Sequence, residues 1–283
     1  MPTVLMTGAS GFTGRLMTQA LRRRDMDVVT LDCDLLNQKA VEAAVMQAKP
    51  DWVVHLAALS FVGDSDSQAF YRVNVFGTLN LLEALKLLKT PPARVLIASS
   101  ANIYGTPEVD IIHEGITPAP VNHYACSKLV MEHMVQPWCD HFPIVITRPF
   151  NYTGSGQNER FLIPKIVSHF QRKSPTIELG NLDVSRDFSD VRDVVAAYIS
   201  LLESSVSGVK VNICSGRAIA LRQVLDYMNE ISGYTIEVLV NPAFVRANEI
   251  PVLRGDNRLL QQLVGHVPAI LIEQTLSDMY MSA

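Results

Sequence analysis

The sequence predicts an α/β protein built on a doubly wound parallel sheet, followed by a smaller mixed α/β lobe. Through the first half of the chain, short apolar runs alternate with segments of helical periodicity, which is typical of parallel strands joined by helices. After residue 150 the elements become shorter and more mixed. We therefore predict one unit over 1–150 and a C-terminal substrate lobe over 151–283, interleaved with the first unit.

The first of these strand–helix units contains a glycine-rich turn, in TVLMTGASGFTGRL at residues 3–16. Gly8 permits a tight turn, Gly11 lets the backbone approach a pyrophosphate, and Gly14 lets the helix pack closely on the strand. A glycine-rich turn without a ligand is the alternative. A second apolar run ends at Asp32, close to the distance at which an acidic residue binds an adenosine ribose. The combination predicts a Rossmann-type sheet that binds NADPH or NADH.

Composition and charge exclude several other classes of protein. The chain has 283 residues, of which 48% are hydrophobic, so its core needs no disulfide or structural metal. A net charge of −4 is too small to indicate binding to nucleic acid or a membrane surface. We find no membrane-spanning stretch and no signal peptide, and the four cysteines lack metal-ligand spacing. We therefore expect a cytoplasmic protein with free thiols and no metal site.

The predicted elements follow in order along the chain. Asp34 comes so soon after Asp32 that a helix and strand often present there are absent or reduced, and the two carboxylates compete for the adenosine role. A helix follows Asn37 and ends near Lys49, and a charged loop leads into a helix over 186–203. The remaining predicted strands are at 52–58, 94–100, 143–151, 210–214 and 235–240. The remaining predicted helices are at 67–88, from Tyr124, at 161–170 and at 221–231.

One helix carries a pair of residues that suits carbonyl chemistry. Tyr124 and Lys128 are four residues apart, so they share a helix face. A nearby ammonium favours the phenolate and lowers the pKa of a tyrosine, which makes it a useful acid or base. Ser100 ends a preceding strand and can hydrogen-bond the same carbonyl oxygen. A surface helix with tyrosine packed on a lysine stem is the alternative, but the glycine turn and serine favour a reductase site.

Five motifs, in order, resemble those of the extended short-chain dehydrogenase/reductase superfamily: GASGFTG, HLAA at 55–58, SSANIYG at 99–105, YACSK at 124–128 and RPFN at 148–151. RDFSDVRDV at 186–194 is similar to the nucleotide-sugar branch. NEIPVLRGDN at 248–257 is similar to its GDP-mannose dehydratase and GDP-4-keto-6-deoxy-mannose reductase group. The resemblance covers nearly the whole chain.

The resemblance implies a role for individual residues. Ser100, Tyr124 and Lys128 correspond to the catalytic triad, and Tyr124 and Lys128 also contact the cofactor. The other cofactor-binding positions are Gly8, Gly11, Phe12, Thr13, Gly14, Asp32, Asp34, Leu56, Ala57, Ala58 and Asn74. The substrate-binding positions are Ser100, Asn102, Asn151, Lys165, Arg186, Arg246 and Glu249. Arginines bind phosphates through forked donors, and a carboxylate can accept from a guanine N–H pair.

Ordinary surface pairing is the alternative for three of the charged positions. Arg186 can pair with Asp187 or Asp190, Arg246 can pair with Glu249, and Lys165 can be surface charge on an amphipathic helix.

The motif SSANIYG bears on the reaction. Dehydratases of this superfamily carry an acidic residue two positions before the motif tyrosine, whereas Asn102 stands there in this chain. An amide cannot transfer the protons that dehydration requires, so our hypothesis is that the chain does not dehydrate.

The resemblance therefore implies reduction, by NADPH or NADH, of the 4-keto group of a nucleotide-activated 6-deoxy sugar. The favoured reaction converts GDP-4-keto-6-deoxy-D-mannose to GDP-D-rhamnose. The alternatives are a nucleotide-sugar 4-epimerase with tightly held NAD and a non-catalytic dinucleotide-binding sensor. The resemblance also implies a homodimer formed by the helices at 67–88 and 124–136.

Overall fold

The computed structural model describes residues 1–60, 66–244, 251–265 and 270–282. Within these residues the largest sheet has six strands, each parallel to its neighbours. In order across the sheet they are β2 (Asp27–Leu31), β1 (Thr3–Thr7), β3 (Trp52–His55), β4 (Arg94–Ala98), β5 (Ile144–Pro149) and β9 (Val209–Ile213). The strand order reverses direction beside β1, as in a Rossmann-type sheet, and confirms the predicted fold class.

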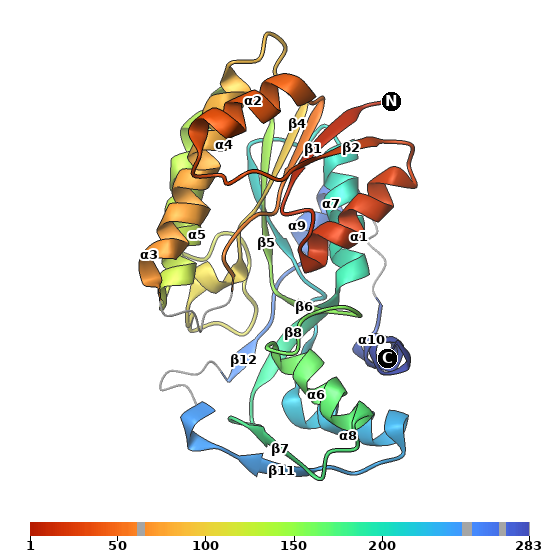
Figure 1. Cartoon of the computed structure of the whole chain (residues 1–283). Helices are drawn as coiled ribbons and strands as arrows, with labels where there is room; N and C mark the ends of the chain where they lie inside the picture. Colours follow the sequence, from red (N-terminus) through yellow and green to blue (C-terminus); the bar gives the residue numbers. More distant parts are fainter. Residues whose placement is uncertain (61–65, 245–250, 266–269, 283) are drawn as a thin grey trace.

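Helices cover both faces of this sheet (Figure 1). On β1, Val4 and Met6 belong to the core on one face, and Leu5 belongs to the core on the other. Burial on both sides explains why the strand is a continuous apolar run without alternation. One face carries α1 (Phe12–Arg22), α7 (Val191–Glu203) and α9 (Arg258–Val264), and the other carries α2 (Gln38–Ala48), α4 (Thr78–Lys86) and α5 (His123–Val135).

The segment predicted as one helix over 67–88 contains a local irregularity. It begins at the Asp66 cap, whose Oδ1 accepts hydrogen bonds from the N–H groups of Gln68 (3.0 Å) and Ala69 (3.1 Å). A π-helical turn, η1 (Arg72–Gly77), separates α3 (Ser67–Tyr71) from α4. Asn74 lies in this turn and is 1% exposed. Such turns are frequent at functional sites because they redirect a side chain out of helical register.

The charged segment at 186–190, predicted as a loop, is a strand. It forms most of β8 (Ser185–Asp190), which pairs with β6 (Asn151–Thr153), β10 (Ala218–Ala220) and β12 (Val252–Leu253). The loop prediction is wrong because the buried Asp187 carboxylate accepts backbone hydrogen bonds from Ser215 (2.8 Å), Gly216 (2.9 Å) and Gly255 (3.2 Å). These bonds offset the cost of burying the charge.

A second core lies below the large sheet in Figure 1. Its elements are α6 (Leu162–Gln171), β7 (Thr176–Leu179), α8 (Leu221–Ser232), β11 (Glu237–Val240) and α10 (Ile272–Met281). Between these elements the chain returns to the large sheet as β9, which pairs with β5. The division at residue 150 stays a prediction. The short helices are η2 (Ala101–Tyr104), η3 (Gln136–Asp140) and η4 (Pro242–Phe244).

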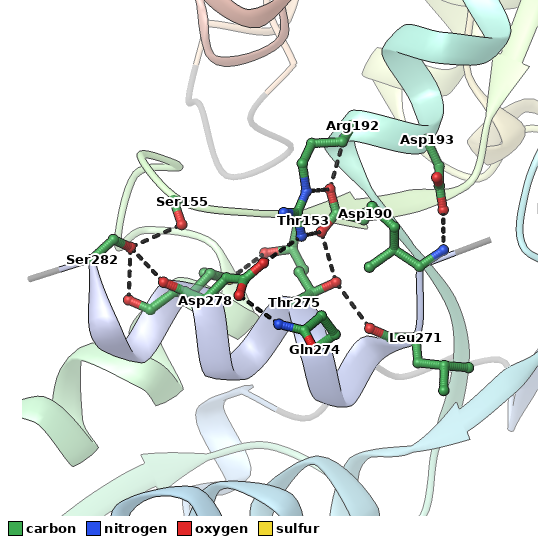
Figure 2. A network of polar contacts seen from close by, with 12 residues as sticks. Thr153, Ser155, Asp190, Arg192, Asp193, Leu271, Gln274, Thr275, Asp278 and Ser282 are labelled. Atoms are coloured by element: carbon green, nitrogen blue, oxygen red, sulfur yellow. Dashed lines mark hydrogen bonds and ion pairs between the residues drawn. The ribbon is translucent and has the colours of Figure 1, made fainter. Parts of the chain in front are cut away.

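The C-terminal helix α10 is held by a polar network on α7 (Figure 2). Asp190 caps α7 and accepts hydrogen bonds from Arg192 Nε (2.9 Å) and from Thr275 Oγ1 (2.8 Å). Arg192 also pairs with Asp278 at 2.7 Å. The Asp193 carboxylate accepts the Ile270 N–H at 2.6 Å. These contacts fix α10 over the second core beside β6.

No helix in the part of the chain that the structure describes has the length and apolar character needed to cross a bilayer.

Helix α1 packs so closely against the glycine turn that one added methyl group should have a large effect on stability. A Cβ on Gly14 would lie 2.0 Å from the Gly8 carbonyl oxygen, so α1 would have to move away from β1. We expect Gly14→Ala to lower the free energy of unfolding by about 3 kcal/mol. Gly208→Ala is the matched control, because Gly208 has φ +69° but open space around its Cβ position, and it should lose about 1 kcal/mol. Urea denaturation measures both, and equal losses would contradict the steric account.

Candidate active site

The carboxyl ends of β1, β3, β4 and β5 lie at one edge of the large sheet, where open α/β sheets bind ligands. Four predicted site segments follow these strands directly. They are the glycine turn at 8–11 after β1, Leu56–Ala58 after β3, Ser99 and Ser100 after β4, and Phe150 and Asn151 after β5.

The glycine turn has the geometry expected of a phosphate-binding loop. Gly8 has φ +70°, and a Cβ there would lie 2.7 Å from Ala57 N, so only glycine allows this approach to β3. Gly11 is exposed, hydrogen-bonds Gly8 O through its N–H (3.1 Å), and precedes α1. No side chain caps α1, and its first turn contains no acidic residue. Its N-terminal N–H groups therefore suit an anionic pyrophosphate.

The next two residues join the glycine turn to strand β6. Thr13 Oγ1 lies 2.9 Å from the Tyr152 hydroxyl, and the Phe12 ring stacks on Tyr152 with centroids 6.1 Å apart. Tyr152 is on β6, immediately after Asn151. We did not predict Tyr152 from the sequence, and its position directly after the RPFN motif was the available signal. Contact of Phe12 and Thr13 with a cofactor stays a prediction.

The structure separates the two carboxylates that compete for the adenosine ribose. Asp34 Oδ1 accepts the Leu36 N–H at 2.9 Å, so this side chain stabilises the turn that leads to α2. Asp32 follows the last residue of β2, is exposed, and accepts a hydrogen bond from Thr30 Oγ1 at 2.8 Å. Asp32 is therefore the better placed of the two.

A buried histidine connects β1, β3 and α4. His55 Nδ1 lies 2.7 Å from Thr7 Oγ1, and Nε2 lies 2.8 Å from Thr78 Oγ1. Thr78 donates its hydroxyl proton to Asn74 O, so Nε2 must donate to Thr78 and Nδ1 must accept from Thr7. The Thr7 hydroxyl in turn accepts the Ala57 N–H (3.1 Å). Burial, with a smaller contribution from Lys128, lowers the His55 pKa to about 3, so the ring is neutral.

Asn74 extends this set of hydrogen bonds to helix α5. Its amide accepts from Leu59 N (2.9 Å) and donates to Leu59 O (3.1 Å) and to Ser127 Oγ (2.9 Å). Ser127 donates to Tyr124 O at 2.7 Å. The side chain of Asn74 is thus occupied in holding the loop after β3 against α5, and its predicted contact with the cofactor stays a prediction.

The three predicted catalytic residues come together at the sheet edge. Helix α5 begins after Asn122, whose side chain accepts the Ala125 N–H, and it presents Tyr124 and Lys128 on one buried face. Ser100 follows β4, and its Oγ accepts the Asn102 N–H at 3.2 Å. Ser100 also forms a side-chain hydrogen bond with Tyr124 that lowers the phenol pKa. The arrangement places a hydroxyl, a phenol and an ammonium in one buried site.

The pKa values of this site are governed by burial. Burial raises the pKa of Tyr124 to about 12, despite the hydrogen bond from Ser100. Burial also lowers the pKa of Lys128 to about 8, and its Nζ donates to Ala98 O at 2.7 Å. The sequence-based expectation that a nearby ammonium lowers the tyrosine pKa is therefore wrong for the protein chain by itself. Desolvation of the phenolate is the largest effect on the Tyr124 pKa, and it raises this pKa.

The predicted substrate-binding residues that the structure describes come from several elements. Asn151 has a buried Nδ2 without a hydrogen-bond partner among the described residues. Lys165 Nζ donates to Glu178 O (2.7 Å) and lies 4.9 Å from the Phe244 ring centroid. Arg186 donates to Ser185 O at 2.9 Å. Asn102 lies half-buried in η2. Arg246 and Glu249 lie outside the described residues.

The two carboxylates named above as alternative partners of Arg186 both accept other hydrogen bonds. Asp187 accepts backbone N–H groups, and Asp190 binds Arg192 and Thr275.

A family model described as GDP-mannose 4,6 dehydratase matches residues 13–279. The chain belongs to this family. It is 40% identical to a GDP-6-deoxy-D-talose 4-dehydrogenase from Aggregatibacter actinomycetemcomitans, over 98% of this chain and 96% of the relative. It is 33% identical to a GDP-6-deoxy-D-mannose reductase from Pseudomonas aeruginosa, over 96% and 94% of the two chains.

The fold is also shared with a solved relative. A structure titled RMD from Pseudomonas aeruginosa complexed with NADPH superimposes with a TM-score of 0.92 at 31% identity, over 99% of this chain and 98% of that chain. These matches confirm the predicted resemblance to the extended short-chain dehydrogenase/reductases and its nucleotide-sugar branch.

The neutral state of His55 predicts how stability depends on pH. Its pKa is about 3 in the folded chain and about 6.5 when unfolded, so the unfolded state binds more protons as pH falls below 6.5. As the pH falls from 7.5 to 5, His55 should therefore lower the free energy of unfolding by about 2 kcal/mol.

Replacement of His55 with glutamine, which keeps a donor and an acceptor, removes this titration. We expect the His55→Gln variant to lose about 2 kcal/mol less stability than the wild type between the two pH values. Urea unfolding at pH 7.5 and 5.0 measures the difference, and other titrating groups affect both proteins equally. Parallel losses would show that His55 is not held neutral.

Proposed function

We propose that the protein uses NADH or NADPH to reduce the 4-keto group of GDP-4-keto-6-deoxy-D-mannose, forming GDP-D-rhamnose. The observation that carries this proposal is the convergence of Ser100, Tyr124 and Lys128 at the carboxyl edge of the sheet, next to the uncapped glycine turn. The names of the two relatives, both concerned with GDP-6-deoxyhexoses, support the choice of substrate.

The catalytic residues act on the oxygen of the ketone. When bound, the reduced nicotinamide supplies hydride to carbon. The Ser100 oxygen accepts the Asn102 N–H, and its proton can turn from the Tyr124 oxygen to the ketone oxygen when substrate binds. Because the Tyr124 pKa is about 12, the phenol is protonated at neutral pH and acts as the acid. The Lys128 ammonium stabilises the phenolate that forms.

The residues around the triad divide into two binding regions. The glycine turn, with Gly8, Gly11 and Gly14, holds the pyrophosphate of the dinucleotide, and Asp32 binds the adenosine ribose. Asn151 offers its unpartnered Nδ2 to the sugar or its phosphate. Lys165, Arg186, Arg246 and Glu249 bind the nucleoside diphosphate.

The relatives also point to a second product. Rhamnose and 6-deoxytalose of the same series differ only in configuration at C4, and the relative at 40% identity is named for the talose compound. Hydride delivery to the other face of the same ketone gives that product. We keep GDP-D-rhamnose as the proposed product and make the talose epimer an outcome of the assay.

We also propose that the protein is a homodimer in the cytoplasm, associated through the helices at 67–88 and 124–136. Apolar side chains that are about half exposed on these helices support the dimer: Phe76 is 55% exposed and Val130 is 46% exposed.

The direct test follows oxidation of NADH and NADPH with GDP-4-keto-6-deoxy-D-mannose generated in place. We expect rapid oxidation and GDP-D-rhamnose as the product, identified by NMR of the sugar. GDP-mannose with cofactor is the control, and it should give no 4-keto-6-deoxy product because Asn102 cannot transfer the required protons. Cofactor binding without oxidation would reject the proposal and favour an epimerase or a sensor.

The acid role of Tyr124 predicts a specific loss. We expect Tyr124→Phe to lower kcat by about 10²–10⁴-fold, because it removes the proton donor but keeps the buried ring. Cofactor affinity, measured by fluorescence titration, should change little. Retention of full turnover would remove Tyr124 from this role.

The position of Asp32 predicts preference for NADH over NADPH, because its carboxylate binds the free ribose and repels a 2′-phosphate. We expect Asp32→Ala to reduce the ratio of kcat/KM for NADH to that for NADPH by about tenfold. Asp34→Ala is the matched control and should leave the ratio unchanged, since Asp34 binds the Leu36 N–H. A change in the ratio for Asp34→Ala alone would reverse the assignment.

A further inference from the structure

A third buried side chain follows the two catalytic residues along α5. Tyr124, Lys128 and Glu132 are spaced four residues apart, so they lie on one face of the helix in consecutive turns. They are 8%, 4% and 0% exposed. The sequence motif identifies the first two, and nothing in the proposed reaction so far uses the third.

Glu132 is held in a fixed position from the neighbouring strand. Arg148 on β5 donates to Glu132 through Nε (2.9 Å) and through a terminal nitrogen (2.7 Å). Arg148 also donates to the Tyr104 hydroxyl at 2.9 Å. Lys210 Nζ on β9 lies 3.4 Å from the Glu132 carboxylate and is partly exposed. Such a two-point contact fixes the orientation of the carboxylate as well as its distance from Lys128.

The charged and polar groups around Lys128 come from several elements. Helix α5 contributes the neutral phenol of Tyr124 and the carboxylate of Glu132, and β3 contributes the neutral His55. The uncharged Ser99 and Ser100 follow β4, and the cations Arg148 and Lys210 lie on β5 and β9. Burial lowers the Lys128 pKa, and the negative charge of Glu132 raises it. Within this described set, Glu132 is the anion that favours the charged lysine.

We propose that Glu132 is a positioning residue whose carboxylate, fixed by Arg148, keeps the Lys128 ammonium protonated at neutral pH. The proposal rests on the catalytic role given to Lys128 above. The buried ammonium donates to the Ala98 carbonyl, which compensates little for its lost hydration, so an anion one turn away on the same helix face favours its charged form. A neutral amine would no longer stabilise the tyrosine phenolate.

The first test is a direct titration of Lys128 in Glu132→Gln. The protein carries lysine labelled with ¹³C at Cε, and the Lys128 signal is assigned by its loss in Lys128→Met. We expect the midpoint to lie near the pKa of about 8 in the wild type and to fall by about one pH unit or more in the variant. The basic limb of kcat should move to lower pH by the same amount.

Two further variants separate this electrostatic role from a structural one. Glu132→Leu combined with Arg148→Met removes both buried charges and leaves neither unpaired. It should shift the midpoint downward by less than Glu132→Gln does, because loss of the Arg148 charge partly offsets loss of the carboxylate. Lys210→Met removes a positive charge beside Glu132 and should shift the midpoint slightly upward. A purely structural Glu132 would lower stability without moving any midpoint, and that result would overturn the proposal.

The titration is independent of turnover, so the two proposals can fail separately. If no keto sugar is reduced but the midpoint moves as expected, the reaction assignment is wrong and the control of Lys128 by Glu132 stands. If the sugar is reduced and the midpoint is unchanged in Glu132→Gln, the reaction stands and this role for Glu132 is rejected.

Discussion

The neutral imidazole of His55 joins the parts of the protein that have to be held in register. One nitrogen accepts from Thr7, immediately before the glycine turn, and the other donates to Thr78 at the start of α4. Asn74 and Ser127 continue the hydrogen bonding to the backbone of Tyr124. A charged ring would lack an acceptor site for Thr7. The hydrogen bonds of this neutral side chain therefore help to hold the glycine turn, the loop after β3 and helix α5 in their relative positions.

Two separate sets of buried polar residues support the proposed chemistry. The hydrogen bonds around His55 contain no net charge and set geometry. The Glu132–Arg148 pair contains full charges, and we propose that its carboxylate favours the charged form of Lys128. Buried ion pairs contribute little net stability compared with apolar replacements, so stability alone does not account for this pair.

Local sequence patterns predicted a feature correctly where that feature depends only on backbone conformation or on helix spacing. The spacing of Gly8, Gly11 and Gly14 predicted the turn, and the spacing of Tyr124 and Lys128 predicted a shared helix face. Strand β8 was missed because the hydrogen-bond donors that stabilise the buried Asp187 carboxylate lie 28 to 68 residues away, which no local pattern reveals. The same limit hid the Arg148 partner of Glu132. It also left Asp32 and Asp34 as alternatives for the adenosine role.

The polar network that fastens α10 has a consequence for the order of events during synthesis. Leu276 and Met279 on α10 are buried in the second core, and Thr275 completes the hydrogen bonding of Asp190. These residues follow β9, the last strand of the large sheet, in the sequence. The large sheet can therefore assemble through β9 before α10 has been synthesised, whereas the second core closes only when α10 docks. Until then, the apolar surface of the second core stays accessible to chaperones.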